Sequence, residues 1–429
     1  MQTTVHPSCS QTEELENSNQ TIPIKVRDPK NKKRSVTCKP LELPPCYVKS
    51  HSNPPVLSPQ TEVFSSSDSY NKYDFRWIFL RLNFPFKFPA WKGWLCATAG
   101  VEEREKSIVQ YLPPINASIT ENDTVQEVLV RAKNCAKEYG QDIALVTFDL
   151  AAAKKAYNIV WQKPETFGNV SIHLGAFHIQ LNYLGALGKL MRGSGIEEIV
   201  FEAGVCANGS IEGVLTGKQY YRSMRVHSLF VEALERLLFK SFQESEGMAD
   251  LILKTKIDLD INLSDLSPSS EQADSFLELL QYYDLFREKV KTGKHGKTAQ
   301  FFLQYMDRVW TLFRLDESVR ANDLDQFIHC LKQLCPLFFM MDHQNYARYL
   351  SYYVAKLESI SKKESDLLRK GGLSAKRSNL SKCGEPYDKV VEETLNKDDK
   401  TQGGIIGFSL NQPAVIRWSE TRHMRACVY

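Results

Sequence analysis

The sequence lacks three features that mark common classes of protein: long apolar runs, paired cysteines and an excess of one charge. None of its 429 residues lies in a stretch of the ~18 to 20 apolar residues that a membrane span needs, so we expect no membrane partner. No apolar segment follows Met1, and we therefore expect no secretory signal. The 10 cysteines include no Cys-x-x-Cys pair, which favours free thiols in a reducing compartment.

The charge balance argues against nucleic-acid binding by the molecule as a whole. Lys and Arg number 54 and Asp and Glu 51, for a net charge of +3, so any basic surface must be local. One cluster stands out, Lys30-Asn31-Lys32-Lys33-Arg34. It fits a nuclear localisation signal or a phosphate-contacting arm, and it equally fits a solvated charge run. Without that signal we expect a cytoplasmic protein.

Composition and periodicity divide the chain into four parts. Residues 1–73 are rich in Ser, Thr, Asn and Pro, which predicts a disordered polar tail. We expect an α/β core at 74–243, a helical region at 244–360 and a charged, partly disordered tail at 361–429. The aromatic stretch 75–94 contains Pro85 and Pro89, which argue against a long helix and favour a strand and turn at the domain edge.

The stretch 142–191 is the most informative. An apolar run at 143–148 ends at Asp149, a helix-compatible segment follows at 151–157, and a second alternating run occupies 170–174. After Gly175, leucines recur at helical spacing as far as Met191. This order predicts an α/β unit with both strands in one sheet. Because clefts in such sheets open at strand ends, Asp149 and His178 are the first candidates for chemistry.

Helical spacing recurs on both sides of this unit. A helix is expected from 118 to about 140, with Thr120 as its cap. The apolar run at 199–204 fits either a strand or a buried helix, and 258–268 is expected to be a loop. Long helices are predicted at 222–242, 271–290, 297–315, 323–334 and 344–360.

Five phrases, in order along the chain, carry a resemblance. They are Val146-Thr147-Phe148-Asp149, Leu174-Gly175-Ala176-Phe177-His178, Arg222-Ser223-Met224-Arg225-Val226-His227, His295-Gly296-Lys297-Thr298-Ala299 and His343-Gln344-Asn345-Tyr346-Ala347-Arg348. Over roughly 93–425 the chain resembles a transposon-derived family with a ribonuclease-H-like domain, akin to cut-and-paste transposases of the DDE type. The resemblance implies an α/β core with a mixed, ribonuclease-H-like sheet, followed by a large helical second half. DNA is then the implied partner.

Transposases of this kind cut DNA with two divalent ions clamped between carboxylates. The ions would be Mg²⁺ or Mn²⁺, and Asp149 at a strand end suits the first ligand. Glu202 or Glu232 would supply a further acid, and His178 lies at the same rim. In the wider superfamily the residue before Phe-His is often acidic, whereas here it is Ala176, which cannot bind a cation.

We therefore expect a transposase-derived protein that has lost catalysis but keeps its fold and some affinity for nucleic acid. Two alternatives are open: an active metal-dependent nuclease with an unusual set of acids, and a helical scaffold for protein interactions. Lys218, Arg222 and Arg225 would contact phosphate in a DNA-binding protein, although solvated cations show the same pattern.

The other candidates also have structural interpretations. Asp149 suits a helix N-cap that accepts from Ala151 or Ala152. His178 and His173 also fit packing histidines. His329, Cys330 and Cys335 fit core or half-buried thiols better than a zinc site, because they lack paired spacing. His343, Asn345 and Arg348 fit either helix capping or the lining of a cleft.

Overall fold

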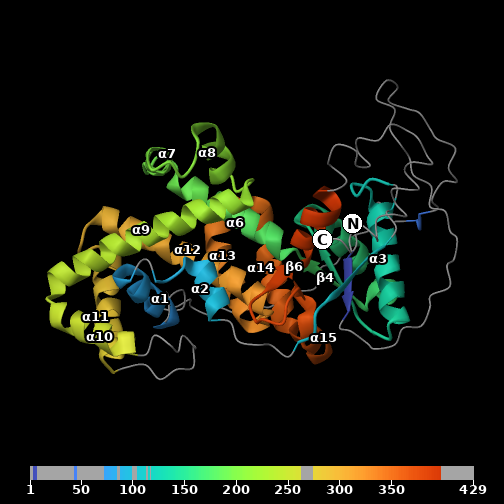
Figure 1. Ribbon diagram of the computed structural model, residues 1–429. Coiled ribbons are helices and arrows are strands. Elements are labelled where there is room, and N and C mark those ends of the chain that lie inside the picture. The colour runs from blue at the N-terminus through green and yellow to red at the C-terminus, as the bar shows by residue number, and fades with distance from the viewer. Residues whose placement is uncertain are drawn as a thin grey trace.

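The computed structural model describes residues 3–6, 43–45, 72–84, 87–98, 104–112, 115, 117–261 and 274–397. Helices dominate these ranges, and the strands within them form three two-stranded sheets (Figure 1). Most of the expected polar tail, including the basic cluster at 30–34, lies outside the described residues, as does 398–429. Inside that tail, β1 (Thr3–His6) pairs antiparallel with β2 (Ile108–Tyr111).

The α/β unit predicted over 142–191 is confirmed. β3 (Ala144–Phe148) and β4 (Val170–Leu174) pair in parallel, with Ala144 opposite Val170 and Phe148 opposite Leu174. The crossover contains α4 (Leu150–Gln162) and α5 (Pro164–Phe167), and α6 (Ala176–Met191) follows β4. Because parallel strands end at the same edge, Asp149 and the start of α6 share one rim of the sheet.

The helix expected from 118 to about 140 is also confirmed, but its N-cap residue differs from the expected one. α3 (Asn122–Glu138) packs on β3 and α4, and it ends before Gly140, which has a φ of +67°. Its N-cap is Glu121 rather than Thr120, and no side chain caps it. All five residues of β4 are buried, as expected for a strand covered on both faces.

The expectation of a strand and turn at 75–94 is wrong. The segment contains α1 (Lys72–Asn83) and α2 (Trp91–Ala97). Pro89 lies between the two helices and interrupts neither of them, whereas Pro85 lies outside the described residues. Trp91 lies edge-on to Trp310, with 5.2 Å between ring centroids, and both rings are buried. The aromatic segment is thus part of the helical core.

The helical second half is confirmed; four of the five long helices end later than predicted, and the last ends one residue earlier, at Ser359. The apolar run at 199–204 is helical as far as Glu202 and, apart from Val200, is exposed, so it is neither a strand nor a buried helix. The predicted loop at 258–268 is helical as far as Ile261. Residues 262–268 lie outside the described residues. None of the described helices is both long and apolar enough to cross a bilayer. The elements are α7 (Ile196–Glu202), α8 (Asn208–Leu215), α9 (Tyr220–Glu246), α10 (Ala249–Ile261), α11 (Asp274–Lys291), α12 (Lys297–Ala321), α13 (Leu324–Met340) and α14 (Gln344–Ser359).

The expected C-terminal tail is folded as far as residue 397. It contains α15 (Lys362–Leu367), η2 (Leu368–Gly372), β5 (Ser374–Lys376), β6 (Gly384–Pro386), α16 (Tyr387–Val391) and η3 (Glu392–Asn396). β5 and β6 pair antiparallel, and α16 packs against α6 and β3 (Figure 1, red). Leu368 is buried in the main core, and Ala375 is buried with Tyr387 and Val390 of the same segment, contacts that a search for local periodicity does not detect.

The coarse fold class therefore holds, and the finer one is not confirmed. The chain has an α/β unit with a large helical second half. The mixed sheet of a ribonuclease-H-like fold is not found among the described strands, which pair only two by two.

Candidate functional site

Asp149 lies at the rim where β3 ends, and its side chain is exposed. It is the N-cap of α4, with extended backbone angles, and its Oδ1 accepts from the amide of Ala152 at 2.9 Å. The capping role proposed from the sequence is thus present. A role as metal ligand stays a prediction, because a capping carboxylate still has lone pairs facing solvent.

The N-terminus of α6 is capped by a residue that the sequence analysis missed. The N-cap position is Gly175, which has no side chain to use. Asp388 of α16 takes its place: Oδ1 accepts from the Phe177 amide at 3.2 Å, and Oδ2 accepts from the His178 amide at 3.0 Å. A carboxylate here is favoured by the helix dipole. A Cβ on residue 175 would lie 2.6 Å from Asp388 Cγ, so glycine is needed for the approach.

Asp388 also binds the His178 ring. Nδ1 of His178 lies 3.0 Å from Oδ2 of Asp388, and the His178 side chain is 26% exposed. Burial lowers the pKa of His178, but the hydrogen bond and charge of Asp388, with the charges of Asp149 and Glu392, outweigh it and leave the pKa raised. A carboxylate on Nδ1 orients the imidazole and leaves Nε2 for proton transfer.

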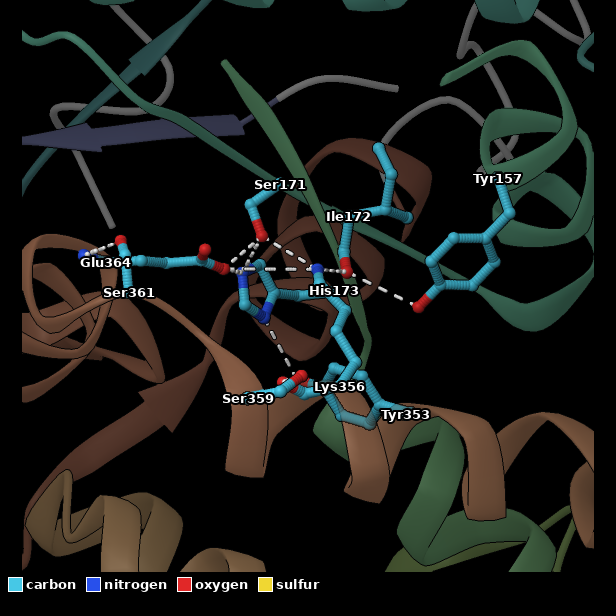
Figure 2. A network of polar contacts seen from close by, with 9 residues as sticks. All are labelled: Tyr157, Ser171, Ile172, His173, Tyr353, Lys356, Ser359, Ser361 and Glu364. Atoms are coloured by element: carbon cyan, nitrogen blue, oxygen red, sulfur yellow. Dashed lines mark hydrogen bonds and ion pairs between the residues drawn. The ribbon is translucent and has the colours of Figure 1, made fainter. Parts of the chain in front are cut away.

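A second polar cluster lies on β4, deeper in the molecule. His173 is buried, with Nε2 3.0 Å from Ser171 Oγ and Nδ1 3.1 Å from the hydroxyl of Tyr353 (Figure 2). Burial, with the charge of Lys356, lowers the pKa of His173 to about 4. His173 is therefore a neutral, packed histidine, as the sequence suggested.

A small cavity separates the two clusters. Its volume is about 10 Å³, and both His173 and Asp388 line it, together with Thr147 and Tyr387. A space of this size is close to the volume of a single water molecule.

Glu202 is not brought to this rim. It is exposed at the end of α7, beyond the end of α6 that is distant from β4 (Figure 1). α6, whose 16 residues span ~24 Å, runs from the rim toward α7. Glu232 forms ion pairs with two arginines: its Oε1 accepts from Arg81 at 3.0 Å and from Arg236 at 2.9 Å.

The three candidate phosphate contacts lie at the start of α9, where the Tyr220 ring lies 5.0 Å from the ring of Phe177 at the start of α6. Lys218, Arg222 and Arg225 are exposed at the start of α9 and just before it. Nη1 of Arg222 donates to Ser210 Oγ at 3.1 Å and to Gln219 Oε1 at 2.9 Å, which orients its side chain along α8.

The proposed zinc cluster has the structural role that the sequence favoured. Cys330 is buried in α13, where burial raises its pKa to about 12, and His329 Nε2 lies 3.0 Å from Gln333 Nε2. Across the described ranges, no group of three or more His, Cys, Asp and Glu side chains is placed to hold a metal ion.

The cluster at the start of α14 approaches the rim in part. Asn345 accepts from Lys154 of α4 at 3.1 Å, whereas Arg348 is exposed and His343 is half-buried at the N-cap position. Burial, with the charges of Asp388 and Asp149, raises the pKa of Tyr346. The start of α14 therefore adjoins the acidic rim.

Comparison with known proteins identifies one family. The model of a domain of unknown function (DUF8702) matches residues 90–428, which cover the α/β unit, the helical half and the segment that carries Asp388. No curated protein and no solved structure matches the chain.

Proposed function

This chain belongs to the DUF8702 family, and we propose that it is a transposase-derived protein that binds nucleic acid but no longer cuts it. The proposal keeps the resemblance seen in the sequence motifs and locates the ancestral reaction centre at the ends of β3 and β4. Asp149 follows the first of these strands, as an acidic metal ligand of a DDE-type transposase would.

The proposal rests on the contacts that the two carboxylates at the rim, Asp149 and Asp388, make with helix N-termini. Asp149 caps α4, and Asp388 caps α6 while it binds the ring of His178. Each carboxylate is therefore stabilised by helix amides. A two-metal reaction instead needs carboxylates directed at a pair of ions. The geometry favours a structural use of both acids, with the His178 ring bound by Asp388.

Nucleic-acid binding is assigned to the exposed cations of the α8–α9 junction. Arg222 and Arg225 are three residues apart in α9 and so lie on neighbouring positions of its surface, and Lys218 lies just before the helix begins. Cations grouped in this way contact phosphates without reading sequence.

The test of binding measures the affinity for a duplex DNA oligonucleotide against salt concentration. The double variant Arg222→Ala/Arg225→Ala should bind more weakly, and its log–log salt slope should fall by about 2. The control is Lys254→Ala, which removes an exposed cation from α10. Equal binding by the double variant and the wild-type protein would refute this assignment.

The test of cutting is a plasmid-nicking assay with Mg²⁺ or Mn²⁺. We expect wild-type protein to nick no faster than Asp149→Asn. Metal-dependent nicking that Asp149→Asn abolishes, and that Glu202→Gln retains, would establish the active nuclease instead. Glu202→Gln is the matched control, because it removes an exposed acid that lies away from the rim.

A further inference from the structure

The polar cluster on β4 lies beneath the same C-terminal segment that carries Asp388. Ser171 and His173 are two residues apart in the strand and therefore point to one face. Figure 2 shows Lys356 of α14 and Glu364 of α15 meeting them there. Lys356 Nζ donates to Ser171 Oγ and to the carbonyl of Ile172, both at 2.7 Å, and the Ser171 hydroxyl donates to Glu364.

Glu364 attaches the segment to the strand. Its Oε1 lies 3.5 Å from His173 Nε2 and 3.9 Å from Lys356 Nζ, and its side chain is only 13% exposed. Burial raises the pKa of Glu364. The hydrogen bonds from His173 and Ser171 and the charge of Lys356 lower the pKa by more than burial raises it, so the net shift is downward. Glu364 is therefore a half-buried carboxylate whose partners lie on β4 and α14, so its contacts depend on α15 staying on β4.

From Glu364 the segment continues to Asp388 through a middle anchor. Asn322, at the end of α12, donates to the carbonyls of Leu368 and Arg369 and accepts from the amide of Leu373. The water-sized cavity lies between the first and last anchors, because His173 and Asp388 both line it. The two polar clusters are thus neighbours beneath one segment.

We propose that Glu364 is a positioning residue for Asp388: by holding α15 on β4, it places the segment so that Asp388 reaches His178. The inference rests on the proposed function for the importance of the strand ends, and it adds how their C-terminal acid is delivered. A segment held only by exposed contacts would leave Asp388 free to move away from α6. Glu364 holds the first part of the segment on β4, and the buried Asn322 holds its middle.

The test follows the titration of the His178 ring by NMR, with the signal assigned by its loss in His178→Gln. In Glu364→Gln, which keeps the size and removes the charge, the pKa of His178 should fall toward its ordinary value. Asp388→Asn should shift it in the same direction by removing the partner itself. Glu364→Asp, which keeps the charge, should recover part of the shift. A purely structural loss of stability would leave the titration of the folded protein unchanged.

Lys363→Ala is the matched control, because it removes an exposed ion pair with Asp142 from the same helix. It should leave the titration of His178 as in the wild-type protein. Amide hydrogen exchange supplies a second readout, with faster exchange expected at 384–391 and unchanged exchange in α12.

The proposal is overturned if His178 titrates in folded Glu364→Gln as it does in the wild-type protein. Should that variant fail to fold, Ser171→Ala, which removes one donor to Glu364, is judged by the same criterion. The readout uses no DNA. If the pKa of His178 falls in Glu364→Gln as expected but the wild-type protein does not bind DNA, only the proposed function is refuted.

Discussion

At the scale of the residue, the contact between Asp388 and His178 depends on the absence of a side chain at position 175. Gly175 has a φ of −62°, so its backbone suits any residue, and only the approach of Asp388 requires glycine. We predict that Gly175→Ala displaces the Asp388 carboxylate from α6. The cost should be about 1–3 kcal/mol of unfolding free energy, from overpacking and a lost cap. Urea unfolding measures it.

Gly209→Ala is the control for that substitution. Gly209 lies in α8, and a Cβ there would meet no atom within 4 Å. The variant should be neutral or stabilised by up to about 1 kcal/mol, because alanine favours the helix. If Gly175→Ala behaves in the same way as Gly209→Ala, the close approach of Asp388 is not required.

At the scale of the element, a buried polar cluster joins three helices of the second half. Glu235 of α9 accepts from Trp310 Nε1 of α12 and from the Tyr283 hydroxyl of α11, each at 2.9 Å. Arg287 of α11 lies 3.3 Å from the same carboxylate and 2.6 Å from Asp307 of α12. Removing one member of such a cluster is costly because the other members are buried with it.

We predict that Glu235→Ala lowers the free energy of unfolding by about 3–5 kcal/mol, since it removes an acceptor shared by an arginine, a tyrosine and a tryptophan. Lys240→Ala, one turn further along α9, should change it by less than about 0.5 kcal/mol, because Lys240 and its partner Glu244 are both exposed. Urea denaturation of both variants decides the matter. Similar losses in the two would contradict a buried role for Glu235.

At the scale of the whole molecule, buried histidines limit the pH range of the fold. Burial, with the charge of Lys356, lowers the pKa of His173 to about 4, and burial lowers that of His227 to about 4. In the unfolded chain both rings take up protons near pH 6.5, which the folded protein does not do. Their stabilising contribution is therefore present above that pH and is lost as the pH falls toward 4.

We predict that the free energy of unfolding falls by about 4 kcal/mol from pH 7 to pH 5, about half from each histidine. The lowered pKa of Glu364 adds to the loss at more acidic pH. His227→Gln should remove roughly half of the decrease between pH 7 and 5. Urea titrations at several pH values measure it, and a flat profile over this interval would refute the assignment of neutral, buried rings.

The sequence by itself determined which segments are helices and strands wherever apolar residues repeat locally. It placed the two strands around Asp149, the helix after Gly175 and the long helices of the second half, because these patterns need only neighbouring residues. It failed at 75–94, where prolines between two helices were taken for breaks within one element.

Only the tertiary structure decided what surrounds His178. Asp388 lies 210 residues away in sequence, within a segment whose charged composition predicted a tail. Its one local signal is a place in the first turn of α16, which says nothing about α6. A contact of this kind depends on how α12, α14 and β4 together hold the segment, and no pattern of neighbouring residues records that arrangement.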